Sequence, residues 1–361
     1  MMTFNGYRPK PIKAKEAEGE PGWEAGERTY SRAIKHRLIG VIIHEVGHNF
    51  FPMIVNSDER RWAWMDEGLN SFLEYLTERE FEPSFPHRRG PADDFALTMF
   101  LSEHDPIMTN PESIHSNGVI SYNKVATGLV MLRELVLGPQ AFDYAFRAYS
   151  NRWKFKRPHP ADFFRTMEDA AGQDLDWFWR GWFYGEDLVD FEIAEIKHYF
   201  FPRTEDLKTA QNTYPAFSLS SQEKFYVDGK PSLHDEYTGK VMAWDRSESS
   251  NEQSISRMIA DHQDKSGDLF HVYHITIGNK GGCVMPIVME VVYGNGEREN
   301  HRIPAQVWMQ GGQTFSYEYR SEREVVAFHL DGLRLLPDPD RSNNLYPQGK
   351  LKKVFEEIDW R

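Results

Sequence analysis

Residues 41–50, VIIHEVGHNF, place two histidines four positions apart in an apolar stretch, with a glutamate directly after the first. Because side chains at positions i and i+4 project from one face of a helix, His44 and His48 can occupy two corners of a tetrahedral zinc site. Glu45 then lies beside the metal, where a general base acts on a bound water. By chance alone, H-E-x-x-H is expected in roughly a few per cent of chains of this length and histidine content. The motif therefore needs a third ligand.

The cysteine content limits which ligand that is. Cys283 is the only cysteine of the 361-residue chain, so neither an intrachain disulfide nor a cluster of thiolate ligands can form. It lies in GGCVMPIVMEVVY, where we expect a buried packing residue rather than a reactive thiol. A metal in this chain is therefore held by histidine and carboxylate.

A glutamate in the next helical segment is the candidate third ligand. Pro52 is predicted to close the first helix, since a helix rarely continues into proline. Apolar side chains then recur at helical spacing, at Leu69, Phe72, Leu73 and Leu76. With Asp66 at the N-cap or in the first turn, Glu67 falls in the first turn of this second helix. Antiparallel packing of the two helices would bring Glu67 over His44 and His48, whereas a helix-capping carboxylate is the alternative interpretation.

The spacing of these residues resembles that of the gluzincin metallopeptidases, specifically the aminopeptidase N family. H-E-x-x-H is followed by 18 residues and then by Glu67, within WMDEGLNSF. The resemblance implies Zn²⁺ as the cofactor, with His44, His48 and Glu67 as its ligands. It also implies that Glu45 is the general base. Thermolysin-type relatives have an aspartate four residues after the ligand glutamate to orient one histidine. Ser71 stands at that position here, so the chain resembles thermolysin less closely.

A tyrosine in a third stretch matches the same family. Residues 118–138, GVISYNKVATGLVMLRELVLG, are predicted to form a long helix that ends at Gly138. The family has a tyrosine in a Tyr-x-Lys-Gly setting at this distance from the zinc motif. The resemblance therefore implies that Tyr122 donates a hydrogen bond to the oxyanion of the tetrahedral intermediate. Val125 replaces the usual glycine, and without the resemblance Tyr122 would be interpreted as a packing residue.

The amine-binding stretch of the family has no counterpart in this sequence. The family has Gly-x-Met-Glu-Asn some 30 residues before the zinc helix, and its glutamate binds the α-amine of the substrate. Residues 1–43 contain no such stretch, and the family places a β-domain and a further β-sheet before the zinc helix. We therefore expect the N-terminal part of the same protein to be missing and the isolated chain to be weakly active or inactive. Natural loss of amine recognition is the alternative.

The remaining sequence predicts helices followed by strands. Helical periodicity continues from residue 139 to about 185, and the alternation typical of strands begins near residue 188. After an irregular stretch, alternation resumes at Leu269 and continues through a hairpin signal at Asn295-Gly296. We therefore expect a multidomain α + β protein. Its mainly helical thermolysin-like (gluzincin) catalytic segment, which the family implies, precedes an all-β immunoglobulin-like sandwich.

The expected segments follow from these changes of pattern. They are a polar lead-in (1–36), the helical zinc-peptidase segment (37–187), a β-sandwich domain (188–340) with an irregular insertion (202–266), and a C-terminal tail (341–361). Within the tail, LKKVFEEID is expected to form a short helix. His271 and His274 are three apart on a strand, so they face opposite sides and cannot share a metal ion.

Composition restricts the partners. The 42 basic and 55 acidic residues give a net charge of −13, which argues against nucleic acid or an anionic membrane as the partner. No apolar run approaches the roughly 18 residues of a transmembrane segment, and the N-terminal MMTFNGYRPK lacks the apolar core of a signal peptide. Peptide substrates are the expected partners. The family has members in several compartments, and among these we expect a bacterial extracytoplasmic one.

Three functions are compatible with the sequence. The leading hypothesis is a zinc aminopeptidase, in which Glu45 moves the proton of a zinc-bound water and Tyr122 stabilises the oxyanion. A zinc endopeptidase is the second. The third is a non-catalytic scaffold or binding protein that retains the zinc site.

Overall fold

The computed structural model describes residues 32–101, 105–202, 225–227, 230–232, 253, 269–310 and 312–347. The first 31 residues of the expected lead-in, most of the expected insertion and the expected LKKVFEEID helix lie outside these ranges. The chain divides into two compact units, which we call the helical unit (1–133 and 140–185) and the β unit (134–139 and 186–361). Among the described residues, no helix has both the length and the apolar character required to cross a bilayer.

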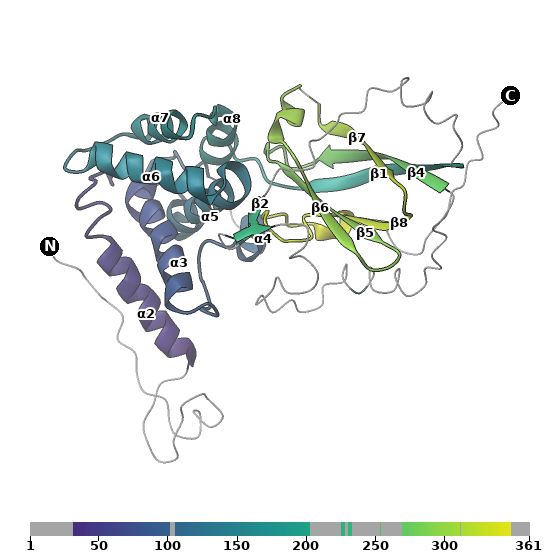
Figure 1. The fold of residues 1–361 in the computed structure, drawn as a ribbon. Coiled ribbons are helices and arrows are strands. Elements are labelled where there is room, and N and C mark those ends of the chain that lie inside the picture. Colours follow the sequence, from purple (N-terminus) through teal and green to yellow (C-terminus); the bar gives the residue numbers. More distant parts are fainter. Residues whose placement is uncertain are drawn as a thin grey trace, which may run out of the picture. The chain divides into compact units, whose positions relative to one another are not determined.

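The described residues between 32 and 183 form helices joined by turns and loops (Figure 1). In order these are α2 (Arg32–Gly47), η1 (Trp64–Gly68), α3 (Leu69–Phe81), α4 (Ala92–Leu101), η2 (Pro111–Ser113), η3 (Gly118–Lys124), α5 (Val125–Met131), η4 (Leu132–Leu137), α6 (Pro139–Trp153), α7 (Pro160–Ala171), α8 (Asp176–Phe178) and η5 (Trp179–Phe183). Consecutive η3, α5 and η4 form the predicted long helix, which ends before Gly138, where φ is +81°. The predicted helical character of residues 139 to 185 is likewise confirmed.

Two local predictions differ from the structure. The first helix ends at Gly47 rather than at Pro52, because the N–H groups of Phe50 and Phe51 turn back to the Gly47 carbonyl. On α3 the predicted apolar positions Leu69 and Phe72 are buried, whereas Leu73 and Leu76 are only half-buried. Their place in the interior is taken by three residues of mixed polarity, Glu74, Tyr75 and Glu78. Glu74 and Glu78 face α2, so that the interface between the two helices is partly polar.

An aromatic core holds the second helix of the zinc motif in position. The Trp64 ring, at the start of η1, stacks on Phe164 of α7 with ring centroids 5.8 Å apart. Phe72 of α3 packs edge to face on Phe142 of α6 at 5.3 Å. Trp64 and Phe72 are both 1% exposed and lie on either side of Glu67 in the sequence. Packing of such large rings is a major source of core stability, so it fixes the backbone that carries Glu67.

The β unit contains antiparallel strands in two main sheets (Figure 1). One sheet has the order β1-β4-β7, formed by β1 (Phe191–Pro202), β4 (Leu269–Asn279) and β7 (Thr314–Ser321). The other has the order β6-β5-β8-β9, formed by β6 (Arg298–Ile303), β5 (Ile287–Tyr293), β8 (Val325–Leu330) and β9 (Leu345–Tyr346). The short β2 (Phe225–Val227) and β3 (Lys230–Ser232) pair with each other. The chain thus combines helices with antiparallel sheets, as predicted.

The two main sheets contact each other through aromatic side chains. The ring of Tyr273 on β4 lies 5.1 Å from that of Phe328 on β8, and the Tyr273 hydroxyl accepts a hydrogen bond from the N–H of Val325 at 2.8 Å. The predicted Asn295-Gly296 turn joins β5 to β6, with φ of +87° at Gly296. This conformation is readily available to glycine.

His271 and His274 lie on opposite faces of β4, as predicted. The His271 ring is buried and its Nδ1 lies 2.9 Å from Nε2 of His198, whereas His274 is exposed and lies 3.4 Å from Glu318. The His271 ring therefore lies in a buried environment and the His274 ring in an exposed one.

Gly68 allows the helix that carries Glu67 to approach its neighbours closely. A methyl group at residue 68 would lie 2.5 Å from Cγ1 of Val125 and 2.8 Å from the Ser121 carbonyl oxygen. Both distances are shorter than van der Waals contact, and a backbone oxygen cannot rotate away. The absence of a side chain at this position is therefore required for the packing of η1 against η3 and α5.

We predict that Gly68→Ala destabilises the protein by about 1 to 3 kcal/mol, the usual cost of overpacking a close contact. Gly118→Ala is the matched control, because a methyl group there meets nothing within 4 Å. It should be neutral or slightly stabilising, since alanine has the higher helix propensity. Urea unfolding followed by circular dichroism measures both, and equal stability of the two variants would contradict the packing argument.

Candidate metal centre and active site

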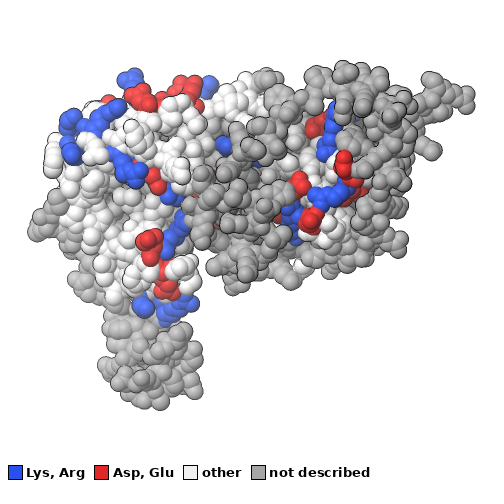
Figure 2. Space-filling view, viewed as in Figure 1, with Lys and Arg blue, Asp and Glu red and all other residues white. Residues whose placement is uncertain are grey.

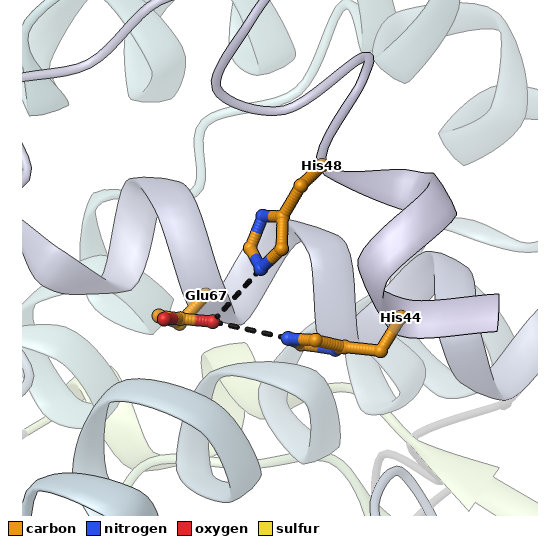
Figure 3. Close-up of side chains that lie close together, drawn as sticks. All are labelled: His44, His48 and Glu67. Atoms are coloured by element: carbon orange, nitrogen blue, oxygen red, sulfur yellow. Dashed lines mark hydrogen bonds and ion pairs between the residues drawn. The ribbon is translucent and has the colours of Figure 1, made fainter. Parts of the chain in front are cut away.

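The structure brings His44, His48 and Glu67 together. His44 is near the end of α2, His48 follows directly after that helix, and Glu67 is in the first turn of η1. Nε2 of His44 lies 3.1 Å, and Nε2 of His48 3.3 Å, from the same Oε2 of Glu67 (Figure 3). One donor atom from each residue lies within 4.8 Å of the other two. Two imidazole nitrogens and one carboxylate oxygen form a donor set that suits zinc.

Contacts on the outer side of each imidazole orient it toward the centre. Nδ1 of His44 lies 3.0 Å from Oε2 of Glu74. Nδ1 of His48 lies 2.9 Å from the Phe51 carbonyl oxygen and 3.1 Å from Oδ1 of Asp66. Because carbonyl and carboxylate oxygens accept hydrogen bonds, we assign a proton to Nδ1 in both rings. Nε2 of each ring then faces the centre, where it either donates a proton to Glu67 or, once that proton is lost, offers its lone pair to a metal.

Glu74 was not identified from the sequence. Ser71 stands where thermolysin-type relatives have an orienting aspartate, and the carboxylate that contacts His44 comes instead from one turn further along α3. The signal was present, because Glu74 is seven residues after Glu67 and such residues lie on one helix face. Arg89 holds the Glu74 carboxylate in place, with Nη1 at 2.7 Å from Oε2.

Glu74 is the first of three carboxylates, at four-residue spacing along α3 and its C-cap, that pair with histidines. The pairs are Glu74 with His44 (3.0 Å), Glu78 with His87 (2.9 Å) and Glu82 with His36 (2.9 Å). Opposite Glu78 the facing helix has Gly40, where a methyl group would lie 2.8 Å from the Glu78 carboxylate. The pairs of Glu74 with His44 and of Glu82 with His36, together with the close contact at Gly40, set the distance between α2 and α3.

The candidate ligands have strongly shifted acidities. Burial raises the pKa of Glu67, but hydrogen bonds with His44, His48 and Tyr122 outweigh it and hold that pKa far below its usual value. Burial lowers the pKa of His48, but hydrogen bonds with Asp66 and Glu67 outweigh it and raise the pKa to about 10. The pKa of His44 is also raised, because its hydrogen bonds with glutamates exceed the effect of burial. The centre therefore favours added positive charge, whether a proton or a metal cation.

Tyr122 and Glu45 lie next to this centre. The Tyr122 ring stacks on His44 with centroids 5.8 Å apart, and its hydroxyl is hydrogen-bonded to Glu67. Burial, reinforced by this hydrogen bond, raises the pKa of Tyr122 far above its usual value, so the phenol stays neutral and can donate. Glu45 follows His44 on α2 and is half-buried. A cavity of about 430 Å³ is lined by Glu45, His44 and Tyr122 among others.

The comparison with known proteins agrees with this arrangement. Residues 25–182 match the Peptidase family M1 domain. The helical unit therefore resembles an M1 peptidase domain. The predicted resemblance to the gluzincin aminopeptidase N family is thereby confirmed, and all five predicted site residues lie inside the matched range.

The relatives of this M1 domain are aminopeptidases. Glutamyl aminopeptidase of Homo sapiens is 30% identical over 146 residues, which cover 38% of this chain and 15% of that protein. Aminopeptidase N of Lactococcus lactis subsp. lactis is 25% identical over 178 residues, which cover 46% of this chain and 21% of that protein. The chain therefore spans a small part of these relatives.

The fold is similar to that of a solved aminopeptidase. The structure of Legionella pneumophila aminopeptidase A in complex with aspartic acid superposes with a TM-score of 0.51 and 12% sequence identity. The match covers 85% of this chain and 27% of that one.

We predict that the free energy of unfolding of Glu78→Gln, relative to that of the parent protein at the same pH, increases as the pH rises. Burial raises the pKa of Glu78 above its ordinary value of 4.5, so the folded protein holds this proton more tightly than the unfolded chain does. That contribution to stability is complete below pH 4.5 and is lost as the pH rises through the folded-state pKa. Glutamine cannot ionise, so the variant does not undergo this loss.

Urea unfolding of both proteins at pH 5 and pH 8 measures the effect. Glu80→Gln, two residues along α3 at an exposed position, is the matched control and should leave the difference between the two pH values unchanged. The raised pKa of Glu78 would be contradicted if the stability of Glu78→Gln changed with pH in the same way as that of the parent protein.

Proposed function

We propose that this chain is the zinc-binding part of an aminopeptidase that hydrolyses N-terminal residues from peptides. The main support is the convergence of two Nε2 atoms, from His44 and His48, on one carboxylate oxygen of Glu67. The spacing and identity of these residues fit the M1 family, to which the matched range belongs. Because the chain spans only a small part of its relatives, their activity is proposed for it and not assigned.

We propose Zn²⁺ as the metal held by His44, His48 and Glu67. The donor set of two imidazoles and one carboxylate, with a fourth position left for water, is common among catalytic zinc sites. The outward hydrogen bonds of both Nδ1 atoms support the neutral tautomer that zinc requires. When bound, zinc would supply Lewis-acid activation of a water and of the scissile carbonyl.

Two side chains would carry out the proton and charge transfers. Glu45 would accept a proton from the attacking water and deliver it to the departing amine, which is the role of a general base and then a general acid. Tyr122 would donate its hydroxyl hydrogen to the carbonyl oxygen as negative charge develops there. Its hydrogen bond with Glu67 supports this role, because it holds the hydroxyl among the candidate ligand atoms.

A zinc endopeptidase is the second candidate. It is favoured by one observation, the lack of a Gly-x-Met-Glu-Asn stretch in residues 1–43. Without a carboxylate that recognises the α-ammonium group, the site would not distinguish a free N-terminus from an internal peptide bond.

We also propose the finer architecture expected from the sequence. The helical residues 37–187 would be the thermolysin-like part of the catalytic domain, and residues 188–340 an immunoglobulin-like sandwich. The antiparallel strand orders and the ring contacts between the two sheets support the second assignment.

We predict that the chain binds one Zn²⁺ and that Glu67→Gln weakens binding by more than about 100-fold. Losing a group that merely orients a ligand already costs about 10- to 100-fold, and here a ligand itself is lost. Glu112→Gln, at an exposed position, is the control. Competition with a chromophoric chelator measures the affinity, and equal affinities of the two variants would refute the ligand assignment.

In the whole aminopeptidase of which this chain is proposed to be a part, Glu45→Gln should retain zinc but lower kcat/KM on amino-acid p-nitroanilides by about 10²- to 10⁴-fold, because an amide cannot accept the proton of the water. Zinc content is measured on the same preparation, so that loss of metal and loss of the base are separated. Activity within twofold of the parent protein would rule out the assigned role.

Peptides with free and acetylated N-termini separate the two candidate functions. An aminopeptidase should cleave only the free form, since it recognises the α-ammonium group. Cleavage of both forms at similar rates would favour the endopeptidase.

A further inference from the structure

The cavity beside the candidate metal centre contains both basic and acidic side chains. Besides His44, Glu45 and Tyr122, its lining includes the arginines Arg37, Arg88 and Arg89 and the glutamates Glu74 and Glu78. Its volume of about 430 Å³ lies within the range of about 300 to 1,000 Å³ that is typical of small-molecule sites. A group bound next to Glu45 would therefore share its cavity with guanidinium groups.

Most charges of this cavity are already paired. Arg89 contacts Glu74 at 2.7 Å and lies over the Tyr122 ring, with Cζ 4.7 Å from the ring centroid. Glu78 is paired with His87 at 2.9 Å. These groups support the wall and the candidate ligands, and they are not available to a substrate without breaking a contact.

Arg88 differs from its neighbours. Its side chain is exposed, it lines the cavity, and its guanidinium forms no hydrogen bond or ion pair with any residue that the structure describes. The backbone that carries it is anchored on both sides. Phe85 is buried, His87 contacts Glu78, and Gly90 adopts a φ of +103° directly against the Tyr75 ring. The backbone position of Arg88 at the cavity is therefore well defined, and its exposed guanidinium is accessible to a bound anion.

The surroundings do not otherwise attract an anion. The chain has a net charge of −13, and on the face drawn in Figure 2 the described basic and acidic side chains are interspersed. Glu45 adds a further negative charge to the cavity itself. A substrate carboxylate would be repelled from this cavity unless a cation contacted it directly. The planar guanidinium of arginine can bind a carboxylate through two parallel hydrogen bonds.

We propose that Arg88 binds a carboxylate of the substrate, so that this site favours substrates with an acidic group close to the scissile bond. The inference rests on the proposed function, because it takes the metal centre as the site of cleavage. The carboxylate has two possible sources, an acidic side chain of the cleaved residue and the free C-terminus of a short peptide. Arg88 is thus a specificity-determining residue and takes no part in the proton transfers.

Isothermal titration of the zinc-loaded chain with hydroxamates tests the proposal without relying on turnover. The first pair is the α-hydroxamates of L-glutamic acid and L-glutamine, which have the same shape and differ in side-chain charge. The second pair is a succinyl hydroxamate of alanylalanine, as the C-terminal acid and as the C-terminal amide. In one of the two pairs, the hydroxamate with the additional carboxylate should bind about five- to tenfold more tightly than its amide analogue. This is the difference expected for a charge-assisted contact at a partly exposed site.

Arg88→Ala should remove this preference and leave the affinity for the neutral partner unchanged. Arg147→Ala is the matched control. It removes an exposed arginine of α6 that lies outside the cavity and that also lacks a partner among the described residues. This variant should retain the full preference. The pair that shows the preference identifies the source of the carboxylate.

Equal binding within both pairs, or a preference that survives Arg88→Ala, would overturn this inference alone. The proposed function would still stand if the neutral hydroxamates bound and Glu67→Gln abolished that binding. Failure of every hydroxamate to bind the zinc-loaded chain would overturn both.

Discussion

The close packing of α2 against α3 is the constraint on which the rest of the site depends. Two histidines on one helix can hold a metal only if a third donor is delivered from a different segment, within a few tenths of an ångström. Here the carboxylate–imidazole pairs His44–Glu74 and His36–Glu82, together with the close contact at Gly40, hold α2 against α3. Buried groups of this kind are costly unless each is paired. The same contacts therefore stabilise the fold and fix the ligand geometry.

The convergence of the three candidate ligands was only partly predictable from local spacing. His44 and His48 lie one turn apart on a helix, which the sequence alone indicates. Glu67 was distinguished from a helix-capping carboxylate only by the resemblance to the gluzincin family. Glu74 was missed because its role depends on which face of α3 meets α2. Hydrophobic periodicity indicated an apolar face that included Leu73 and Leu76, whereas the structure buries Glu74 and Glu78. A polar helix interface cannot be identified from an apolar pattern.

The β unit was predictable in its strands but not in their partners. Alternation located β1, β4 and β5, and the Asn-Gly pair located the turn between β5 and β6. The pairing of β1 with β4 joins Phe191 to Asn279 across a long stretch of chain. Such a pairing is determined by burial of both faces in three dimensions, so local pattern carries little information about it. The sorting of the strands into two sheets likewise required the structure.

The contact between Gly68 and Val125 links two motifs that are separate in the sequence. One residue follows the ligand glutamate, and the other occupies the position where the family usually has glycine after its tyrosine and lysine. The volume available between η1 and α5 is shared by these two positions, so the size of one side chain limits the size of the other. Restoring the family glycine at residue 125 alone would leave an unfilled space directly behind the carboxylate. The backbone of η1 would then be free to shift, and the candidate metal centre would lose its rigid support. The two motifs therefore behave as one structural unit, in which a change that is conservative for either motif is disruptive for the pair.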